Sequence, residues 1–317
     1  MRPFVLVGVT VLMLSACDDR ATPEPSRAAP SSSARAEASS LAPVASSSES
    51  PPSRVDYELV ATQPLPADLH GLALFAHHVA YAEGARLMLM DWRTGEWRTV
   101  LTSEYGELHL LHQHGQGEVR YLDVLDVEPG PAGEDPSSPR RVVTIDLGTG
   151  RATPVDRRPD QVVVGEFNDA RYELAGGDLV ARWQQPDPDL PDRAVTTTGG
   201  LVVEAVLGGG TRFVWTQSPN VSTPDPATVW TQDLIRPEPS PTLLAADGVP
   251  YDPIVGTGFA GWSDNGLRVL LVPTSGGPAV QLPGRQAWGT GPAADRQLVA
   301  MAVRSGGEVS LAVYRVG

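Results

Sequence analysis

Two segments of the chain share one pattern, and this pattern decides the fold. Residues 87–100 read LMLMDWRTGEWRTV, and residues 142–155 read VVTIDLGTGRATPV. Each is an apolar run followed by Asp, two further residues, Thr-Gly and a second β-rich run. The aspartate side chain is suited to capping a turn, and the glycine supplies the positive φ that such a turn needs. Each segment therefore predicts a β-hairpin.

Weaker copies of the pattern follow toward the C-terminus. They lie at residues 228–234 (TVWTQDL), 268–277 (RVLLVPTSGG) and 311–315 (LAVYR). With a degenerate copy placed near Ala194 to Val206, five steps cover the 224 residues between Asp91 and Arg315. The mean period of about 45 residues, with about four short strands per unit, is typical of a β-propeller blade.

The hairpins resemble those of TolB-type and tryptophan-aspartate repeat propellers. Residues 262–266 (WSDNG) also resemble the Trp-Ser-Pro-Asp-Gly turn of TolB-type blades, although Asn265 and the missing proline depart from it. The resemblance implies an all-β chain folded as a β-propeller of about six blades, with five or seven as alternatives. We expect the strand Tyr57–Ala61 to pair with the last blade and close the ring. A β-sandwich is the rival fold, and it would show fewer hairpins of this kind.

The first 17 residues predict export and lipidation. Phe4 to Ala16 form an apolar run of about 13 residues, too short for a membrane span and typical of the central region of a signal peptide. Leu14-Ser15-Ala16-Cys17 resembles the lipobox of bacterial lipoproteins, in which the cysteine thiol takes a diacylglyceryl group. A secretory signal that happens to carry a cysteine is the alternative.

The lipobox resemblance implies a signal peptide over residues 1–16 and a lipid anchor, with an amine-linked acyl chain such as palmitate, on Cys17. It places the protein in the bacterial cell envelope, on the inner or the outer membrane, with the globular domain facing the periplasm. Asp18 is similar to an inner-membrane retention signal of some enteric bacteria.

Residues 17–54 predict a disordered linker. Of the 37 residues from 18 to 54, 25 are Ser, Ala or Pro, and none is aromatic. Such a segment cannot bury enough apolar area to offset its chain entropy. The remaining residues, 55–317, are enough for one large all-β domain.

Composition excludes several function classes. The formal net charge is −14, which leaves no basic face for DNA or RNA. All 24 basic residues are arginine, so mechanisms that need a lysine amine are excluded. Cys17 is the single cysteine, which excludes intrachain disulfides and cysteine-cluster zinc sites.

The histidines gather in one part of the chain, between residues 70 and 114. His112 and His114 fall on the same face of an expected strand, a spacing that two metal-ligating imidazoles can use. If this strand is innermost in its blade, that face lines the central channel. The pair is a candidate site for a divalent metal, and histidines beside an apolar strand without a metal are the alternative.

Three proline-rich acidic segments predict a second candidate site. They are Glu128–Pro139, Pro186–Asp192 and Ser218–Ala227, and each is expected to join the second and third strands of its unit. Equivalent loops emerge on one face of a propeller, so they would form an acidic rim suited to a basic partner or a weak Ca²⁺ contact. The rim residues are Glu128, Glu134, Asp135, Asp187, Asp189, Asp192 and Asp225.

No nucleophile motif of the Gly-x-Ser-x-Gly type occurs, and the seven tryptophans are expected to pack in blade cores. The sequence thus predicts a non-catalytic protein-binding or scaffolding module without a cofactor, anchored to a membrane and partnered by another envelope protein. A metal-assisted hydrolase or lactonase that uses the channel histidines is the alternative function.

Overall fold

The computed structural model describes residues 54–114, 120–129, 140–155, 162–167, 170–175, 178–183, 193–194, 200–208, 211–219, 225–234 and 241–317. The described part of the chain contains β-strands and no helix, and therefore no helix that would be long and apolar enough to span a membrane.

The described strands form six four-stranded antiparallel sheets. The first strands are β2 (Leu69–Phe75), β6 (Glu107–His114), β10 (Val162–Phe167), β14 (Leu201–Gly208), β18 (Pro250–Val255) and β22 (Ala293–Asp295). The second strands are β3 (His78–Glu83), β7 (Tyr121–Val127), β11 (Ala170–Ala175), β15 (Arg212–Ser218), β19 (Phe259–Asp264) and β23 (Leu298–Ser305). The third strands are β4 (Arg86–Asp91), β8 (Arg140–Asp146), β12 (Asp178–Trp183), β16 (Thr228–Asp233), β20 (Arg268–Pro273) and β24 (Glu308–Val316). The fourth strands are β5 (Trp97–Thr102), β9 (Arg151–Val155), β13 (Arg193–Ala194), β17 (Thr242–Ala245), β21 (Val280–Gln281) and, for the last sheet, β1 (Tyr57–Leu65).

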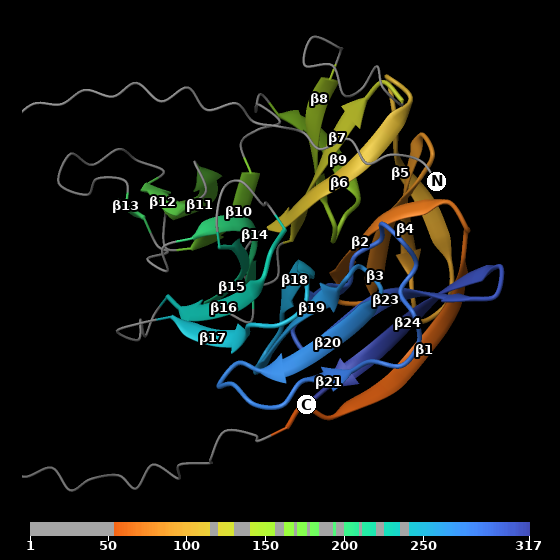
Figure 1. Cartoon of the computed structure of the whole chain (residues 1–317). Helices are drawn as coiled ribbons and strands as arrows, with labels where there is room; N and C mark the ends of the chain where they lie inside the picture. The colour runs from red at the N-terminus through yellow and green to blue at the C-terminus, as the bar shows by residue number, and fades with distance from the viewer. Residues whose placement is uncertain are drawn as a thin grey trace, which may run out of the picture. The chain divides into compact units, whose positions relative to one another are not determined.

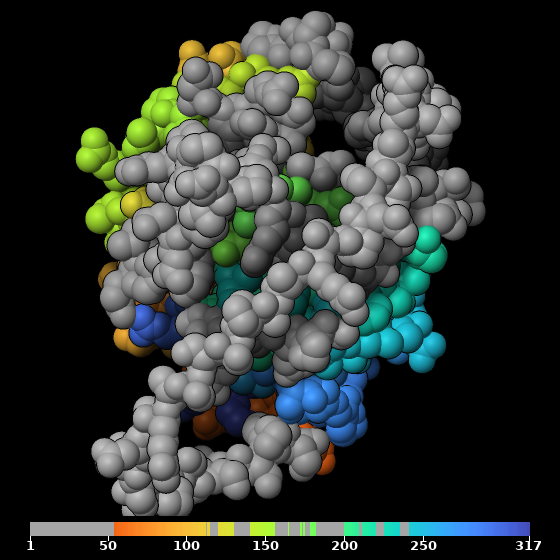
Figure 2. All heavy atoms as spheres, turned by 90° about the vertical axis from the view of Figure 1, so that its left-hand side faces the viewer, coloured from red at the N-terminus to blue at the C-terminus, as the bar shows by residue number. Residues whose placement is uncertain are grey.

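The first strands contact one another in a closed ring. β2 contacts β6, and contacts continue through β10, β14, β18 and β22 back to β2. Figure 1 shows the sheets arranged around this ring. In Figure 2, β8 and β9 (yellow-green) and β16 and β17 (cyan) lie at opposite margins of the molecule. The expected all-β propeller is confirmed, and the β-sandwich is wrong.

The N-terminal strand completes the last sheet, as expected. β1 pairs antiparallel with β24, from Tyr57 opposite Val316 to Leu65 opposite Val309. A sheet built from both ends of the domain covers the strand edge that β24 would otherwise expose.

The first sheet is packed on both faces, which explains the continuous apolar run of residues 87–90. Leu87 and Leu89 pack with residues of β6 and β7 in the following sheet, whereas Met88 and Met90 pack with residues of β23 and β24 in the preceding one. Successive side chains of a strand point to opposite faces, so a strand between two neighbours is apolar at every position.

The two expected hairpins are confirmed. Asp91 Oδ1 accepts the Arg93 N–H at 2.9 Å, and Asp146 Oδ1 accepts the Gly148 and Thr149 N–H groups at 2.9 and 3.1 Å. Gly95 and Gly150 adopt φ of 77° and 72°, and each donates its N–H to the carbonyl of the aspartate. Both hairpins join the third and fourth strands of a sheet.

The degenerate copy of the repeat is not where the sequence placed it. Residues 194–206 run from β13 into β14, whereas the strand equivalent to β4 and β8 in that sheet is β12. β12 lacks an aspartate at its end, because Trp183 occupies that position. The other copies, in β16, β20 and β24, are third strands as the pattern predicts.

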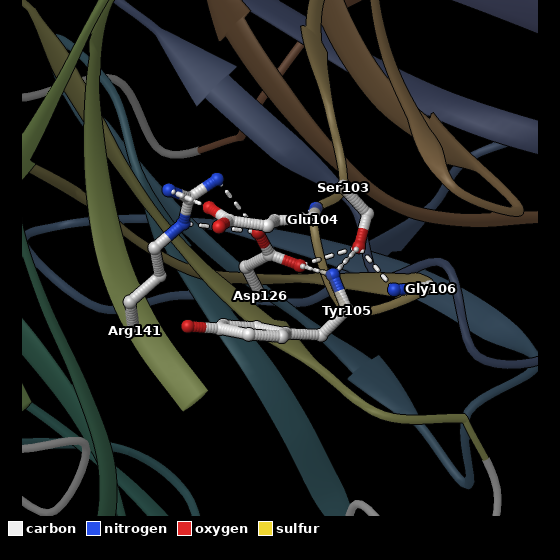
Figure 3. A network of polar contacts seen from close by, with 6 residues as sticks. All are labelled: Ser103, Glu104, Tyr105, Gly106, Asp126 and Arg141. Atoms are coloured by element: carbon white, nitrogen blue, oxygen red, sulfur yellow. Dashed lines mark hydrogen bonds and ion pairs between the residues drawn. The ribbon is translucent and has the colours of Figure 1, made fainter. Parts of the chain in front are cut away.

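A buried carboxylate fixes the connection from the first sheet to the second (Figure 3). The Asp126 side chain accepts hydrogen bonds from Ser103 Oγ and from the N–H groups of Glu104 and Tyr105, and it pairs with Arg141. Ser103 Oγ in turn accepts the Gly106 N–H at 2.6 Å. Asp126 is fully buried, so this network satisfies a charge that would otherwise be costly to bury.

Candidate functional site

A cavity of about 430 Å³, the central channel, lies within the ring of first strands. All six first strands contribute to its lining, together with the segment Gly289–Pro292 that leads into β22. Concave sites lined by several elements, with a few convergent polar groups, are the usual binding sites of proteins. The channel is therefore the principal candidate site.

The strands that line the channel are irregular. β2, β6, β10, β14 and β18 each show a register shift against the second strand of their sheet. A β-bulge redirects the side chains beside it, and bulges are frequent next to functional sites. The irregularities explain why polar side chains enter the channel from strands that are otherwise apolar.

Two carboxyl groups from neighbouring sheets meet in the channel wall. Glu204 lies in the bulge of β14, and its Oε2 accepts the backbone N–H of Asp252 in β18 at 2.6 Å. Asp252 adopts a φ of 48°, which is uncommon for a residue other than glycine. Burial, and then the charge of Asp252, raise the pKa of Glu204 to about 8, so Glu204 holds a proton at pH 7. Burial also raises the pKa of Asp252.

Charged groups also lie where the first strands end. Arg120 Nε lies 3.8 Å from Asp295 Oδ1, and both side chains line the channel. Asp295 Oδ2 also accepts the Ala76 N–H at 2.8 Å. This ion pair lies at the carboxyl end of β22.

At the amino ends of the first strands, an exposed aromatic residue adjoins the channel lining. Trp288 is 63% exposed and immediately precedes the lining segment Gly289–Pro292. Tyr251, the neighbour of Asp252, donates its hydroxyl to Asp225 Oδ1 at 3.2 Å. Trp and Tyr side chains are enriched at surfaces that bind protein partners.

The predicted channel histidines are only partly described. His114 lines the channel and is 7% exposed, with Nε2 3.3 Å from Asp123 Oδ1. Neither of its ring nitrogens makes a hydrogen bond with a described residue. The side chain of His112 lies outside the described residues, so a metal site on His112 and His114 stays a prediction.

The predicted acidic rim is also partly described. Glu128 is half-buried after β7 and Asp225 is exposed, whereas Glu134, Asp135, Asp187, Asp189 and Asp192 lie outside the described residues. The expectation that all three acidic segments join second and third strands is wrong for Pro186–Asp192. In the chain that segment stands between β12 and β13, the third and fourth strands of their sheet.

Tryptophan packing is mixed. Trp92, Trp215 and Trp262 are buried as expected, whereas Trp97 and Trp288 are about 60% exposed. Sequence reasoning also missed Glu204 and Asp252. The two residues are 48 positions apart in the sequence, and no sequence pattern links them before the ring brings their strands together.

No protein-family model and no curated protein sequence matches the chain. Solved structures do resemble it. Tricorn protease has a TM-score of 0.50 and 9% identity, covering 75% of this chain and 24% of that one. The β-propeller domain of Myceliophteria thermophila Cps50 (Swd1) has a TM-score of 0.44 and 11% identity, covering 83% and 100%. An oligogalacturonate lyase in complex with manganese has a TM-score of 0.44 and 12% identity, covering 76% and 74%. At these identities the likeness concerns the fold alone.

Proposed function

We propose that this chain is a lipid-anchored protein of the bacterial cell envelope whose propeller binds a basic partner protein and catalyses no reaction. The observation that carries the proposal is the carboxyl pair Glu204 and Asp252 in the channel wall. The channel has room for a side chain. A cationic group that enters it can form charge-assisted hydrogen bonds with the carboxyl groups of Glu204 and Asp252.

The surroundings of the pair fit a basic partner. The chain has a formal charge of −14, which attracts cationic segments over long range. Trp288 and Tyr251 offer aromatic surface near the amino end of the first strands, and an arginine stacks well on such rings. The predicted rim residues Glu128 and Asp225 would extend the acidic surface on the side where second and third strands connect.

Proton release is part of the proposed binding step. Glu204 holds its proton because it is buried beside Asp252. An arginine or lysine that enters the channel supplies the positive charge that stabilises the ionised form. Binding then expels the proton of Glu204, and the affinity rises with pH between about 6 and 8.

The anchor is a separate element of the proposal. Lipidation of Cys17, followed by the linker over residues 18–54, would hold the domain at about 30 to 37 Å from the membrane as a flexible coil. Replacing the thiol tests this: the variant Cys17→Ala should move from the membrane fraction to the soluble fraction. Equal sedimentation of the variant and the parent would refute the anchor.

Crosslinking capture from envelopes tests the binding function. The full-length protein is the bait, and the double variant Glu204→Gln/Asp252→Asn is compared with it and with Glu308→Gln, which changes an exposed acid on β24. We expect the parent and the control to capture one specific protein and the double variant to lose it. Capture by all three baits would exclude the channel, and capture by none would overturn the binding function.

A metal-assisted hydrolase that uses His112 and His114 is the competing proposal. The observation in its favour is the buried His114, whose ring nitrogens are free of hydrogen bonds from the described residues. Stoichiometric metal that is lost in the variant His112→Ala/His114→Ala would favour this enzyme over the binding module.

A further inference from the structure

Three metal-ligating side chains meet at one end of the first sheet, outside the channel. His77 lies in the turn between β2 and β3, His78 begins β3, and Asp91 ends β4. One ligand atom from each residue lies within 4.8 Å of the others. His77 Nε2 is 3.9 Å from Asp91 Oδ2, and the two imidazole centroids are 4.1 Å apart.

The backbone holds these residues in place. Three hydrogen bonds hold the turn that carries His77. Trp92 donates two of them, from its backbone N–H to the His77 carbonyl at 3.0 Å and from Nε1 to the Ala76 carbonyl at 3.0 Å. The third runs from the Ala76 N–H to the Asp295 side chain. His78 is the cross-strand partner of Asp91. The arrangement is therefore preorganised by the fold, which lowers the cost of gathering ligands around an ion.

One oxygen of Asp91 is already used, and the other faces His77. Oδ1 accepts the Arg93 N–H in the hairpin, which orients the carboxylate. Oδ2 is the atom nearest to His77 Nε2. Ligating carboxylates in metal sites are typically fixed by such a second hydrogen bond.

The equivalent position in another sheet is built differently. Asp233 ends β16 as Asp91 ends β4, and the Leu234 N–H donates to the Thr211 carbonyl as Trp92 does to His77. There the carboxylate accepts Thr211 Oγ1 at 3.2 Å and pairs with Arg212 at 3.3 Å. His77 and His78 occupy the places of Thr211 and Arg212. The first sheet therefore has two imidazoles beside its aspartate, where the other sheet has a hydroxyl and a permanently charged guanidinium group.

The imidazoles are suited to ligation. A neutral imidazole offers the lone pair that a metal ion needs.

We propose that His77, His78 and Asp91 form a binding site for one Zn²⁺ ion. Two imidazole nitrogens and one carboxylate oxygen are a common zinc ligand set, and a fourth position stays open to water. Ligand atoms around tetrahedral zinc lie about 3.4 Å apart, as follows from metal–ligand distances of about 2.1 Å. The side chains of His77 and Asp91 are 40% and 28% exposed, so small side-chain rotations suffice to reach that spacing.

Zinc titration of the full chain in detergent tests the site. Isothermal calorimetry with Zn²⁺ alone, with metal analysis after dialysis, should give one ion per chain. The variants His77→Ala, His78→Ala and Asp91→Asn should each weaken binding at least tenfold. Asparagine keeps an oxygen for the Arg93 N–H, so the hairpin is retained, and the thermal unfolding of each variant without metal checks the fold.

Two controls separate this site from the channel. His109→Ala changes a half-exposed histidine beside Glu107, and it should bind zinc as the parent does. The variant His112→Ala/His114→Ala should also bind zinc unchanged. Absence of zinc binding to the parent, or loss of binding in the channel variant with retention in His78→Ala, would overturn the proposal.

Discussion

The side chain of Glu204 accepts the backbone N–H of Asp252 at 2.6 Å, and this bond joins the first strands of two neighbouring sheets. A second joint of this type lies on another side of the ring, where Gln113 in β6 bonds to both backbone groups of Leu74 in β2. Strands of different sheets share no ladder of hydrogen bonds. Side chains from bulges therefore supply polar contacts between neighbouring blades.

The Glu204 joint predicts a pH-dependent stability. Its folded-state pKa of about 8 lies above the ordinary value of 4.5, so between these values the folded chain keeps a proton that the unfolded chain has lost. The contribution to the free energy of unfolding is present below pH 4.5 and is lost as the pH rises toward 8. As the pH rises from 5 to 8, the free energy of unfolding of Glu204→Gln should therefore increase relative to that of the parent by at least about 1 kcal/mol.

Urea unfolding at both pH values measures this difference. Glu308→Gln is the matched control, because it removes an exposed carboxyl from β24. A parent and a Glu204→Gln variant with the same pH dependence would contradict the raised pKa of Glu204 in the folded chain.

The Gln113 joint predicts a cost that depends on both hydrogen bonds. Its Oε1 accepts the Leu74 N–H at 3.1 Å, and its Nε2 donates to the Leu74 carbonyl at 2.7 Å. Gln113→Ala leaves both buried backbone groups unpaired and should cost about 1 to 3 kcal/mol in urea unfolding. Gln113→Glu keeps only the acceptor and should also be destabilised, whereas Gln281→Ala on the exposed edge of β21 should change little. Equal stability of Gln113→Ala and Gln281→Ala would show that the hydrogen bonds of Gln113 do not stabilise the ring.

The network around Asp126 predicts a larger effect. Asp126→Ala leaves the Glu104 and Tyr105 N–H groups without their acceptor and Arg141 without its buried partner, which should cost about 3 to 5 kcal/mol. Asp126→Asn keeps one acceptor oxygen and should cost less. Glu104→Gln, which changes the exposed partner of Arg141, should stay within about 0.5 kcal/mol of the parent. Chemical denaturation of the three variants measures the order of their losses in unfolding free energy. A larger loss in Glu104→Gln than in Asp126→Ala would contradict the central role of Asp126 in the network.

Sequence patterns predicted the parts of the fold that depend on local chemistry. The Asp91 and Asp146 turns could be predicted because capping and positive φ are written in adjacent residues. The closing strand at Tyr57 could be predicted because a ring needs its edge covered. The copy placed near Ala194 was wrong because β12 ends on Trp183 instead of an aspartate and no Thr-Gly follows it at the spacing of the pattern, so no local signal distinguishes this strand.

The candidate site could not be predicted in the same way. Glu204 and Asp252 belong to different sheets, and only the bulges in β14 and β18 bring their carboxyl groups together. The cluster of His77, His78 and Asp91 was easier to predict, since the hairpin aspartate and His78 are only 13 positions apart. What was missing was the antiparallel pairing of β3 with β4, which places His78 opposite Asp91.

The closing strand gives the last prediction. β1 pairs along the length of β24, and Tyr57 packs edge-on against Tyr314 with ring centroids 5.8 Å apart. Deleting residues 1–65 uncovers the β24 edge, which should lower the melting temperature and promote aggregation through edge pairing. Deleting residues 1–53 keeps β1 and should leave the melting temperature within about 2 °C of the parent, since it removes none of these contacts. A synthetic peptide of residues 54–66 should restore the shorter protein by adding the missing strand. Thermal unfolding and light scattering measure both effects, and equal stability of the two deletions would mean that β1 does not hold the ring closed.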